Sequence, residues 1–142
     1  MPKFRPLKKE DHEDLIVLLS QLVQDPSKFD FEKLDIDRLI ESPHCHCIVI
    51  EHEKKAIGFG ALSVFLTPTY GYKGKIEDII IHEKHRGKGL GKKLMQKLLK
   101  IAKDNKIKNI HLTSNPKRIP ARKLYESLGF KQKDTGIFVL DI

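Results

Sequence analysis

The fold is indicated most clearly by Ile76-Glu77-Asp78-Ile79-Ile80-Ile81-His82, which is followed closely by Arg86-Gly87-Lys88-Gly89-Leu90-Gly91-Lys92. An isoleucine-rich run of this length is typical of a buried strand. Three glycines at alternate positions then open a region in which apolar residues recur with helical spacing, namely Leu90, Leu94, Leu98, Ile101 and Ala102. The sequence therefore predicts a buried strand, a tight glycine-rich turn and a long helix in direct succession.

The glycine-rich turn has the composition of an anion site. Glycines let the backbone approach a ligand closely, and the free N–H groups and positive dipole end of a helix's first turn favour phosphate. Arg86, Lys88 and Lys92 add positive charge at the same place. The spacing GxGxG matches neither the GxxxxGK[ST] loop nor the GxGxxG dinucleotide fingerprint, so a kinase or an NAD enzyme is disfavoured. A pyrophosphate-binding turn follows from residue type and position, and a turn without a ligand is the alternative that the motif alone leaves open.

Helices and strands alternate on both sides of this motif. Strands are expected at Lys3–Leu7, His46–Glu51, Ala56–Phe65, Lys75–His82 and Lys108–Thr113, with a final hairpin of Phe130–Lys133 and Gly136–Asp141. Helices are expected at Asp11–Val23 with Asp11 as N-cap, at Asp35–Glu41, from the glycines to Asn105, and at Ile119–Leu128 with Gly129 as a C-cap. Thr67–Gly74 is expected to be a loop. The order βααβββαβαββ places the chain in the α/β (α+β mixed) class, around a mixed sheet.

Composition narrows the classes of function. The 142 residues fit one domain, and an apolar fraction of 39% is enough for a core. With 27 Lys and Arg against 19 Asp and Glu the net charge is +8, but Trp is absent and only 3 Tyr occur, so an anionic small molecule is favoured over nucleic acid. No apolar run is long enough for a bilayer, and the first residues have no apolar signal region, which predicts a cytoplasmic protein with no membrane partner.

The segment His44-Cys45-His46-Cys47 invites a metal interpretation. Alternation along a strand would put both cysteines on one face and both histidines on the other, and the CxxC spacing of zinc sites is absent. We therefore expect no metal site, and two cysteines this close cannot build a disulfide framework.

Two motifs taken together resemble the GNAT acyltransferase superfamily. Arg86-Gly87-Lys88-Gly89-Leu90-Gly91 is similar to that family's signature [RQ]xxGxG[AG]. Ala121-Arg122-Lys123-Leu124-Tyr125-Glu126-Ser127-Leu128-Gly129-Phe130 is similar to its second signature, AxxLYExLGF. The start at Phe4-Arg5-Pro6-Leu7, followed by a helix with acidic residues at its beginning, also resembles the family, so the resemblance covers nearly the whole chain as a single domain, residues 1–142.

The resemblance implies a sheet that is splayed between its two central strands, is flanked by helices and binds acetyl-CoA as acyl donor. Backbone groups of Ile79 and Ile81 would pair with the pantetheine amides, and the N–H groups from Arg86 to Gly91 would hold the pyrophosphate. Many members carry Asn seven residues before the tyrosine, where this chain has Arg118, so either Arg118 or the nearby Asn115 is the expected contact to CoA. The implied cofactor set is Ile79, Ile80, Ile81, Arg86, Gly87, Lys88, Gly89, Leu90, Gly91, Lys92, Asn115, Arg118, Ala121 and Tyr125.

The same resemblance implies the catalytic roles. Glu77 is the candidate base, acting through water, and Glu77 and Asp78 would point to opposite faces of a regular strand, so that one is catalytic and the other structural. Tyr125 is the candidate acid that protonates the leaving thiolate, and the N–H of Ile79 or Ile80 would polarise the thioester carbonyl. The expected reaction is direct acetylation of a primary amine on a small molecule.

The acceptor is less clearly indicated than the donor. Similarity to glucosamine-6-phosphate and aminoalkylphosphonate acetyltransferases, together with the positive charge, favours an anionic amine, with walls from Gln24–Phe31 and Thr67–Gly74. A peptide or protein amine, and a non-catalytic module that binds acyl-CoA or another anion, are the alternatives. Homodimers through the C-terminal strands are common in the family, and no residue here demands one.

Overall fold

A mixed sheet of five strands organises most of the chain, and the computed structural model describes all of residues 1–142. The strands are β1 (Lys3–Pro6), β2 (Cys45–His52), β3 (Lys55–Thr67), β4 (Gly71–Ile81) and β5 (Asn109–His111), and the helices are α1 (His12–Leu22), α2 (Ile36–Glu41), α3 (Leu90–Asp104) and α4 (Ile119–Ser127). Strands β1 to β4 pair antiparallel in chain order, and β5 pairs parallel to β4. The mixed α/β class expected from the sequence is confirmed.

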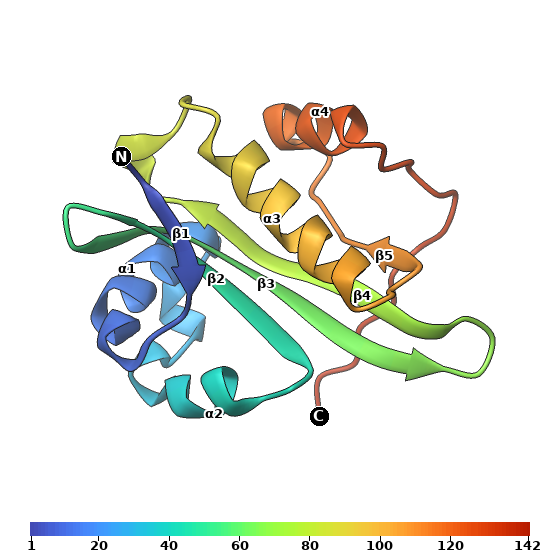
Figure 1. The fold of residues 1–142 in the computed structure, drawn as a ribbon, viewed down its shortest axis with the longest axis horizontal. Coiled ribbons are helices and arrows are strands. Elements are labelled where there is room, and N and C mark those ends of the chain that lie inside the picture. The colour runs from blue at the N-terminus through green and yellow to red at the C-terminus, as the bar shows by residue number, and fades with distance from the viewer. The chain divides into compact units, whose positions relative to one another are not determined.

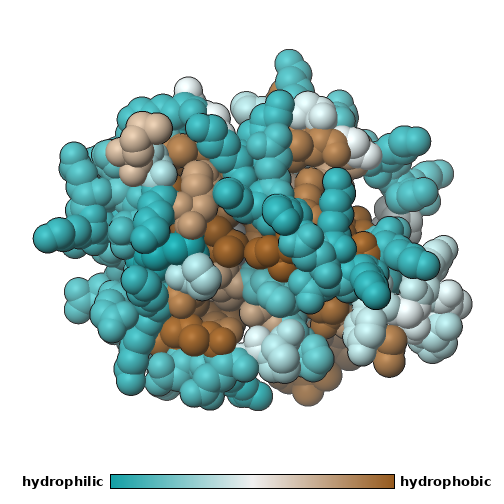
Figure 2. All heavy atoms as spheres, viewed as in Figure 1, coloured by the Kyte–Doolittle hydropathy of each residue, from teal (hydrophilic) through white to brown (hydrophobic).

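The chain forms two compact units, Met1–Leu112 and Thr113–Ile142. The first unit contains the whole sheet with α1, α2 and α3, and the second contains α4 (Figure 1). None of the helices has the length and apolar content that crossing a bilayer requires. Figure 2 shows hydrophilic side chains over most of the face in view, with apolar residues visible in the gaps between them.

Helices α1 and α3 cover opposite faces of the sheet. Side chains along β2 and β3 alternate between these faces, so each strand packs against both helices. Val49, Phe59 and Ala61 belong to one buried cluster with residues of α1, including Leu15 and Leu18. On the other face, a Cβ at Gly60 would lie 3.2 Å from both Leu94 and Leu98 of α3. The centre of the sheet is thus covered on both faces by packed leucines.

A buried ion pair fixes the start of the chain against α1. Both guanidinium ends of Arg5 donate to the Asp11 carboxylate at 2.8 Å, and the Arg5 Nε also donates to Glu51 at 3.0 Å. Asp11 stands at the N-cap position of α1, as expected, but its side chain makes no capping bond there. It accepts instead from Arg5 and from the backbone N–H of Lys8, at 2.8 Å.

The prediction of a loop at Thr67–Gly74 is wrong, because most of these residues belong to strands. β3 runs to Thr67 and β4 begins at Gly71, so only three residues form the turn. The Thr67 hydroxyl accepts from the Tyr70 N–H at 3.1 Å and donates to the Gly71 carbonyl at 3.0 Å, which closes the turn. Gly71 has φ of 73°, a conformation that costs glycine little.

The expected final hairpin, Phe130–Lys133 with Gly136–Asp141, is also wrong, since neither segment forms a strand. The sheet contains only β1 to β5, and the two segments are paired neither with it nor with each other, so they lack the ladder of backbone hydrogen bonds that a strand requires. The side chains of Ile137, Phe138, Val139 and Leu140 are exposed, that of Phe138 fully so. The observed order is βααβββαβα.

Candidate active site

Strand β4 is interrupted by a β-bulge at the residues expected to carry the chemistry. Phe59 pairs with Ile80 and Ala61 pairs with Glu77, so the single residue Gly60 faces both Asp78 and Ile79. Asp78 occupies the bulge with φ of 54°, in the left-handed region that aspartate tolerates better than most residues. Bulges redirect side chains, and they are frequent beside active sites.

The bulge overturns the expectation that Glu77 and Asp78 point to opposite faces. Glu77 pairs with Ala61, which belongs to the core cluster on the α1 face. Asp78 lines a pocket together with Leu19 and Leu22 of α1, so it also lies on that face. The inserted residue shifts the alternation by one position, and both carboxylates end on the same side of the sheet.

The two carboxylates differ in their surroundings. The Glu77 carboxylate forms an ion pair with the Lys75 ammonium at 2.8 Å, and both side chains are partly exposed. Asp78 has no such partner. Apolar surroundings raise the pKa of Asp78, the negative charge of Glu77 raises it further, and Lys75 acts in the opposite sense. The Asp78 carboxylate therefore holds a proton more tightly than an ordinary aspartate does, and it lines a pocket.

The C-terminal half of β4 has one edge free of strand pairing. β5 pairs only with Lys73–Lys75, so it does not reach the bulge. The His82 N–H donates to the Ile57 carbonyl of the neighbouring strand at 2.8 Å. Because peptide groups alternate sides along a strand, those of Ile80 also face β3, and those of Ile79 and Ile81 face the free edge. The Ile81 carbonyl accepts there from Arg86 Nε at 2.8 Å.

The glycine-rich turn follows this edge directly. Gly87 and Gly89 have φ of 78° and 77°, and a Cβ at either position would meet nothing within 4 Å. Gly89 is the N-cap of α3, so Leu90 is the first helical residue and Gly91 lies inside the helix. The side chains of Arg86, Lys88 and Lys92 are exposed, whereas Leu90 is buried and anchors the first turn. The free N–H groups of that turn and the three cations around them are groups that could bind an anion, so the anion site stays a prediction.

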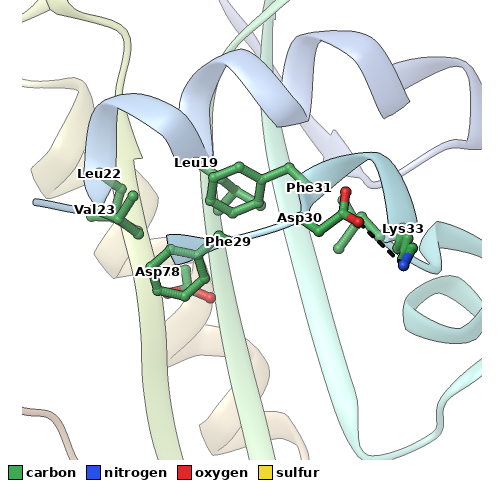
Figure 3. Close-up of a pocket in the computed structure, with 9 residues that line it drawn as sticks. Leu19, Leu22, Val23, Phe29, Asp30, Phe31, Lys33 and Asp78 are labelled. Atoms are coloured by element: carbon green, nitrogen blue, oxygen red, sulfur yellow. Dashed lines mark ion pairs between the residues drawn. The ribbon is translucent and has the colours of Figure 1, made fainter. Parts of the chain in front are cut away.

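A pocket of about 340 Å³ opens on the α1 face beside Asp78 (Figure 3). Its lining consists mostly of apolar residues from α1 and the segment after it, namely Leu19, Leu22, Val23, Phe29, Phe31 and Leu34, with the charged residues Asp30, Lys33 and Asp78. The rings of Phe29 and Phe31 are stacked, with centroids 5.4 Å apart and planes at 6°. Lys33 forms an ion pair with Asp30 at 3.4 Å.

The pocket includes part of one acceptor wall and none of the other. Phe29, Asp30 and Phe31 belong to the expected wall Gln24–Phe31, but no residue of Thr67–Gly74 lines the pocket. Sequence reasoning missed the other lining residues of α1 and the segment after it, namely Leu19, Leu22, Val23, Lys33 and Leu34. The signal for Phe29 and Phe31 was two phenylalanines flanking an aspartate in a segment without helical or strand periodicity.

The cysteines of β2 lie on one face, as alternation predicts. The sulfur atoms of Cys45 and Cys47 are 3.7 Å apart, and both thiols are free. A hydrogen bond from the Cys47 thiol lowers the pKa of Cys45 to about 6. No group of three or more His, Cys, Asp or Glu side chains is arranged to hold a metal ion.

The remaining candidate residues belong to the second unit. Tyr125 lies on α4, half-buried, with its ring 6.1 Å from that of Phe130, and burial raises its pKa. Gly129 has φ of 95° and donates to the Glu126 carbonyl at 3.0 Å, so it ends α4 as expected. Arg118 is the N-cap residue of α4, and Asn115 accepts from the Lys117 N–H at 2.9 Å. Ala121 lies in the first turn of the same helix.

The first unit thus brings together Asp78, the free edge at Ile79 and Ile81, and the glycine-rich turn. Glu77 lines no part of the pocket, and Ile80 packs into the core.

Comparison with known proteins gives the same family for both units. The acetyltransferase (GNAT) family profile matches residues 15–130. Glucosamine 6-phosphate N-acetyltransferase of Trypanosoma brucei brucei is 27% identical over 133 residues, which cover 91% of this chain and 88% of that protein. Thialysine N-epsilon-acetyltransferase of Bos taurus is 26% identical, covering 88% of this chain and 81% of that protein.

Solved structures agree. The crystal structure of glucosamine-6-phosphate N-acetyltransferase from Arabidopsis thaliana superimposes with a TM-score of 0.82 at 26% identity, covering 99% of this chain and 98% of that one. The family profile covers both signatures and the strand between them. The chain belongs to the acetyltransferase (GNAT) family and is an acetyl-CoA-dependent N-acetyltransferase.

Proposed function

We propose that the chain transfers the acetyl group of acetyl-CoA directly to a primary amine of a small molecule, and that its two units act as one domain. The observation that carries this proposal is the free edge of β4 at Ile79 and Ile81, which leads directly into the glycine-rich turn. An unpaired edge supplies backbone donors and acceptors for an extended amide chain, and the turn supplies donors for a diphosphate. Acetyl-CoA contains both groups in that order.

The donor would be held mostly by backbone. Ile79 and Ile81 pair with the pantetheine amides, and Arg86 moves from the Ile81 carbonyl as the arm enters. The N–H groups from Arg86 to Gly91 hold the diphosphate, with Lys88 and Lys92 adding charge. Asn115, Arg118 and Ala121 of the second unit are the proposed further contacts to the cofactor.

Transfer to an amine makes three chemical demands. An alkyl ammonium, with a pKa near 10.4, must lose a proton before its nitrogen attacks the thioester carbon. We assign the contact with the amine to Asp78 and keep Glu77 as the base that acts through water, since the two carboxylates share one face. The proton leaves through that pair to solvent.

The other two demands concern the thioester. The oxyanion that develops on the carbonyl needs a positioned N–H donor, and Ile79 is favoured over Ile80 because the Ile80 N–H faces β3. The C–S bond then breaks and Tyr125 gives its proton to the leaving thiolate, while the second proton that the amine nitrogen loses on forming the amide restores the tyrosine. The pKa of Tyr125 is raised by burial above its ordinary value, so the hydroxyl carries its proton at neutral pH.

An anionic amine is one candidate acceptor. It is supported by the relatives that act on glucosamine 6-phosphate and by the net charge of +8. A cationic amine is the other, supported by the thialysine relative and by a spermine/spermidine N(1)-acetyltransferase of Bacillus subtilis that is 30% identical over 102 residues.

The test combines calorimetric titration with acetyl-CoA and a thiol-release assay over a panel of amines. We expect acetyl-CoA to bind and at least one amine to release thiol. Tyr125→Phe should lower kcat about 100-fold, with the dissociation constant of acetyl-CoA nearly unchanged. Glu77→Gln should be slow at neutral pH and recover as the pH is raised, because the free amine then forms without a base.

Each proposed role can fail separately. An unchanged kcat in Tyr125→Phe removes the acid role, and wild-type rates for Glu77→Gln at neutral pH remove the base role. Binding of acetyl-CoA without thiol release from any amine would make the chain a binding module and end the proposal of catalysis.

A further inference from the structure

We propose that the pocket beside Asp78 binds the acceptor and selects a primary amine carried on a flat apolar group, in preference to a phosphorylated amine. This inference rests on the proposed acetyl transfer and names the acceptor class. The pocket volume of about 340 Å³ lies at the lower end of the range for small-molecule sites, so it suits an acceptor of modest size.

The walls of the pocket are apolar on most sides. Six of the nine lining residues are leucine, valine or phenylalanine, and Figure 3 shows the rings of Phe29 and Phe31 among them. Phe29 keeps 53% of its surface exposed. An exposed phenyl ring beside a pocket favours an apolar group that removes its face from water, and stacked rings favour one that is flat.

The charges of the lining select for a cation. Lys33 is the only positive residue, and it is already paired with Asp30 at 3.4 Å. Asp78 is left as a carboxylate without a partner, because its neighbour Lys75 binds Glu77 at 2.8 Å. In apolar surroundings an unpaired carboxylate attracts an ammonium strongly and repels a phosphate. No second cation of the lining is available to offset that repulsion.

The position of Asp78 relates this selection to the chemistry. Asp78 sits in the bulge directly before Ile79, whose peptide groups face the free edge where the thioester is proposed to lie. An ammonium held by Asp78 would therefore lie next to Ile79, whose backbone N–H is the proposed oxyanion donor. The apolar part of the acceptor would lie against Phe29 and Phe31, which line the same pocket as Asp78 (Figure 3).

The test measures kcat/KM for 2-phenylethylamine, glucosamine and glucosamine 6-phosphate with saturating acetyl-CoA. We expect 2-phenylethylamine to exceed glucosamine 6-phosphate by about tenfold or more, with glucosamine between them. Phe29→Ala should lower kcat/KM for 2-phenylethylamine about tenfold through KM and leave glucosamine unaffected. Phe65→Ala, which removes an exposed ring outside the pocket, is the matched control and should change neither.

Asp78→Asn separates the charge from the shape. It should raise KM for 2-phenylethylamine and narrow the preference over glucosamine 6-phosphate, since the repulsion of phosphate is removed with the attraction for ammonium. Calorimetric titration of 2-phenylethylamine, with excess coenzyme A present so that no transfer occurs, gives the same comparison without turnover.

The outcomes distinguish this inference from the proposed function. Faster turnover of glucosamine 6-phosphate than of 2-phenylethylamine, or a Phe29→Ala variant that keeps the wild-type ratio, overturns the acceptor class while acetyl transfer stands. Binding of 2-phenylethylamine that Phe29→Ala abolishes, without acetylation of any amine, supports the pocket and overturns the transfer. Failure to bind acetyl-CoA overturns the proposed function, and the inference falls with it.

Discussion

Asp78 shows how a single residue can combine conformational and electrostatic cost at a candidate site. Its backbone has φ of 54°, and its carboxylate lies among apolar side chains with Glu77 nearby. Both features work against the folded state, and neither is needed for the sheet on either side of the bulge. Such a residue is expected where binding or catalysis requires a charge that packing alone would exclude.

We predict that Asp78→Asn melts at a higher temperature than the wild type at about pH 7.5, because asparagine tolerates the left-handed conformation and removes the carboxylate charge. The pKa of Asp78 is raised on folding, so the folded state binds its proton more tightly than the unfolded state does. The Asp78 contribution to stability is therefore present at low pH and is lost as the pH rises from the ordinary aspartate value of about 3.9 through the raised pKa.

Thermal melts of both proteins across this range check the sign. The advantage of Asp78→Asn should be largest at neutral pH and should fall to its smallest value below the ordinary aspartate pKa of about 3.9, where the wild-type carboxyl becomes protonated in both states. A difference in melting temperature that is independent of pH would show that the charge is not responsible.

Strand β4 and the turn after it together form the proposed site for acetyl-CoA. The strand ends with an unpaired edge, and the chain then passes two glycines with positive φ before α3 begins at Leu90. Any residue with a Cβ would strain the backbone at these glycines and would project a methyl group where the ligand is proposed to lie. Gly71 has almost the same conformation, with φ of 73°, but it sits at the hairpin between β3 and β4.

This similarity gives a matched pair of variants. Gly89→Ala and Gly71→Ala should each lower the free energy of unfolding by about 1–2 kcal/mol, since both force alanine into the left-handed region. Gly89→Ala alone should weaken acetyl-CoA binding, by about tenfold, because it also obstructs the anion site. Denaturant titration and calorimetry measure the two effects, and equal loss of acetyl-CoA affinity in both variants would contradict the assignment of the turn.

The charge of the whole molecule matters for a ligand that carries phosphates. The net charge is +8, and exposed cations surround the glycine-rich turn at Arg86, Lys88 and Lys92. The long-range part of this attraction is screened by salt, because the Debye length falls from about 10 Å at 0.1 M to about 3 Å at 1 M. The apolar pocket beside Asp78 does not depend on that field.

We therefore predict that the dissociation constant of acetyl-CoA rises about tenfold between about 0.1 M and 1 M NaCl. S-acetyl-pantetheine lacks the diphosphate, so its use as a donor should show little salt dependence. Steady-state kinetics with both donors at several salt concentrations measure the difference. The same salt effect on both would mean that the cations around the turn do not contact the phosphates.

The sequence by itself determined the features that depend on neighbours in the chain. The run of isoleucines predicted the second half of β4, the spacing of the leucines predicted α3, and Gly129 marked the end of α4, because these follow from local backbone preferences. The two signatures identified the family, which the match to residues 15–130 confirms. The proposed backbone contacts to the donor lie close together in the chain, from Ile79 to Gly91, so they could be predicted before any fold was known.

The tertiary structure alone decided what depends on residues far apart in the chain. The bulge opposite Gly60 set both carboxylates on one face, where strict alternation had separated them, and the short pairing of β5 left Ile79 and Ile81 at an open edge. The pocket exists only because the chain after α1 returns to Asp78 with Phe29. Strand register and cavity walls are set by packing between distant segments, and a sequence read along the chain contains no local signal for either.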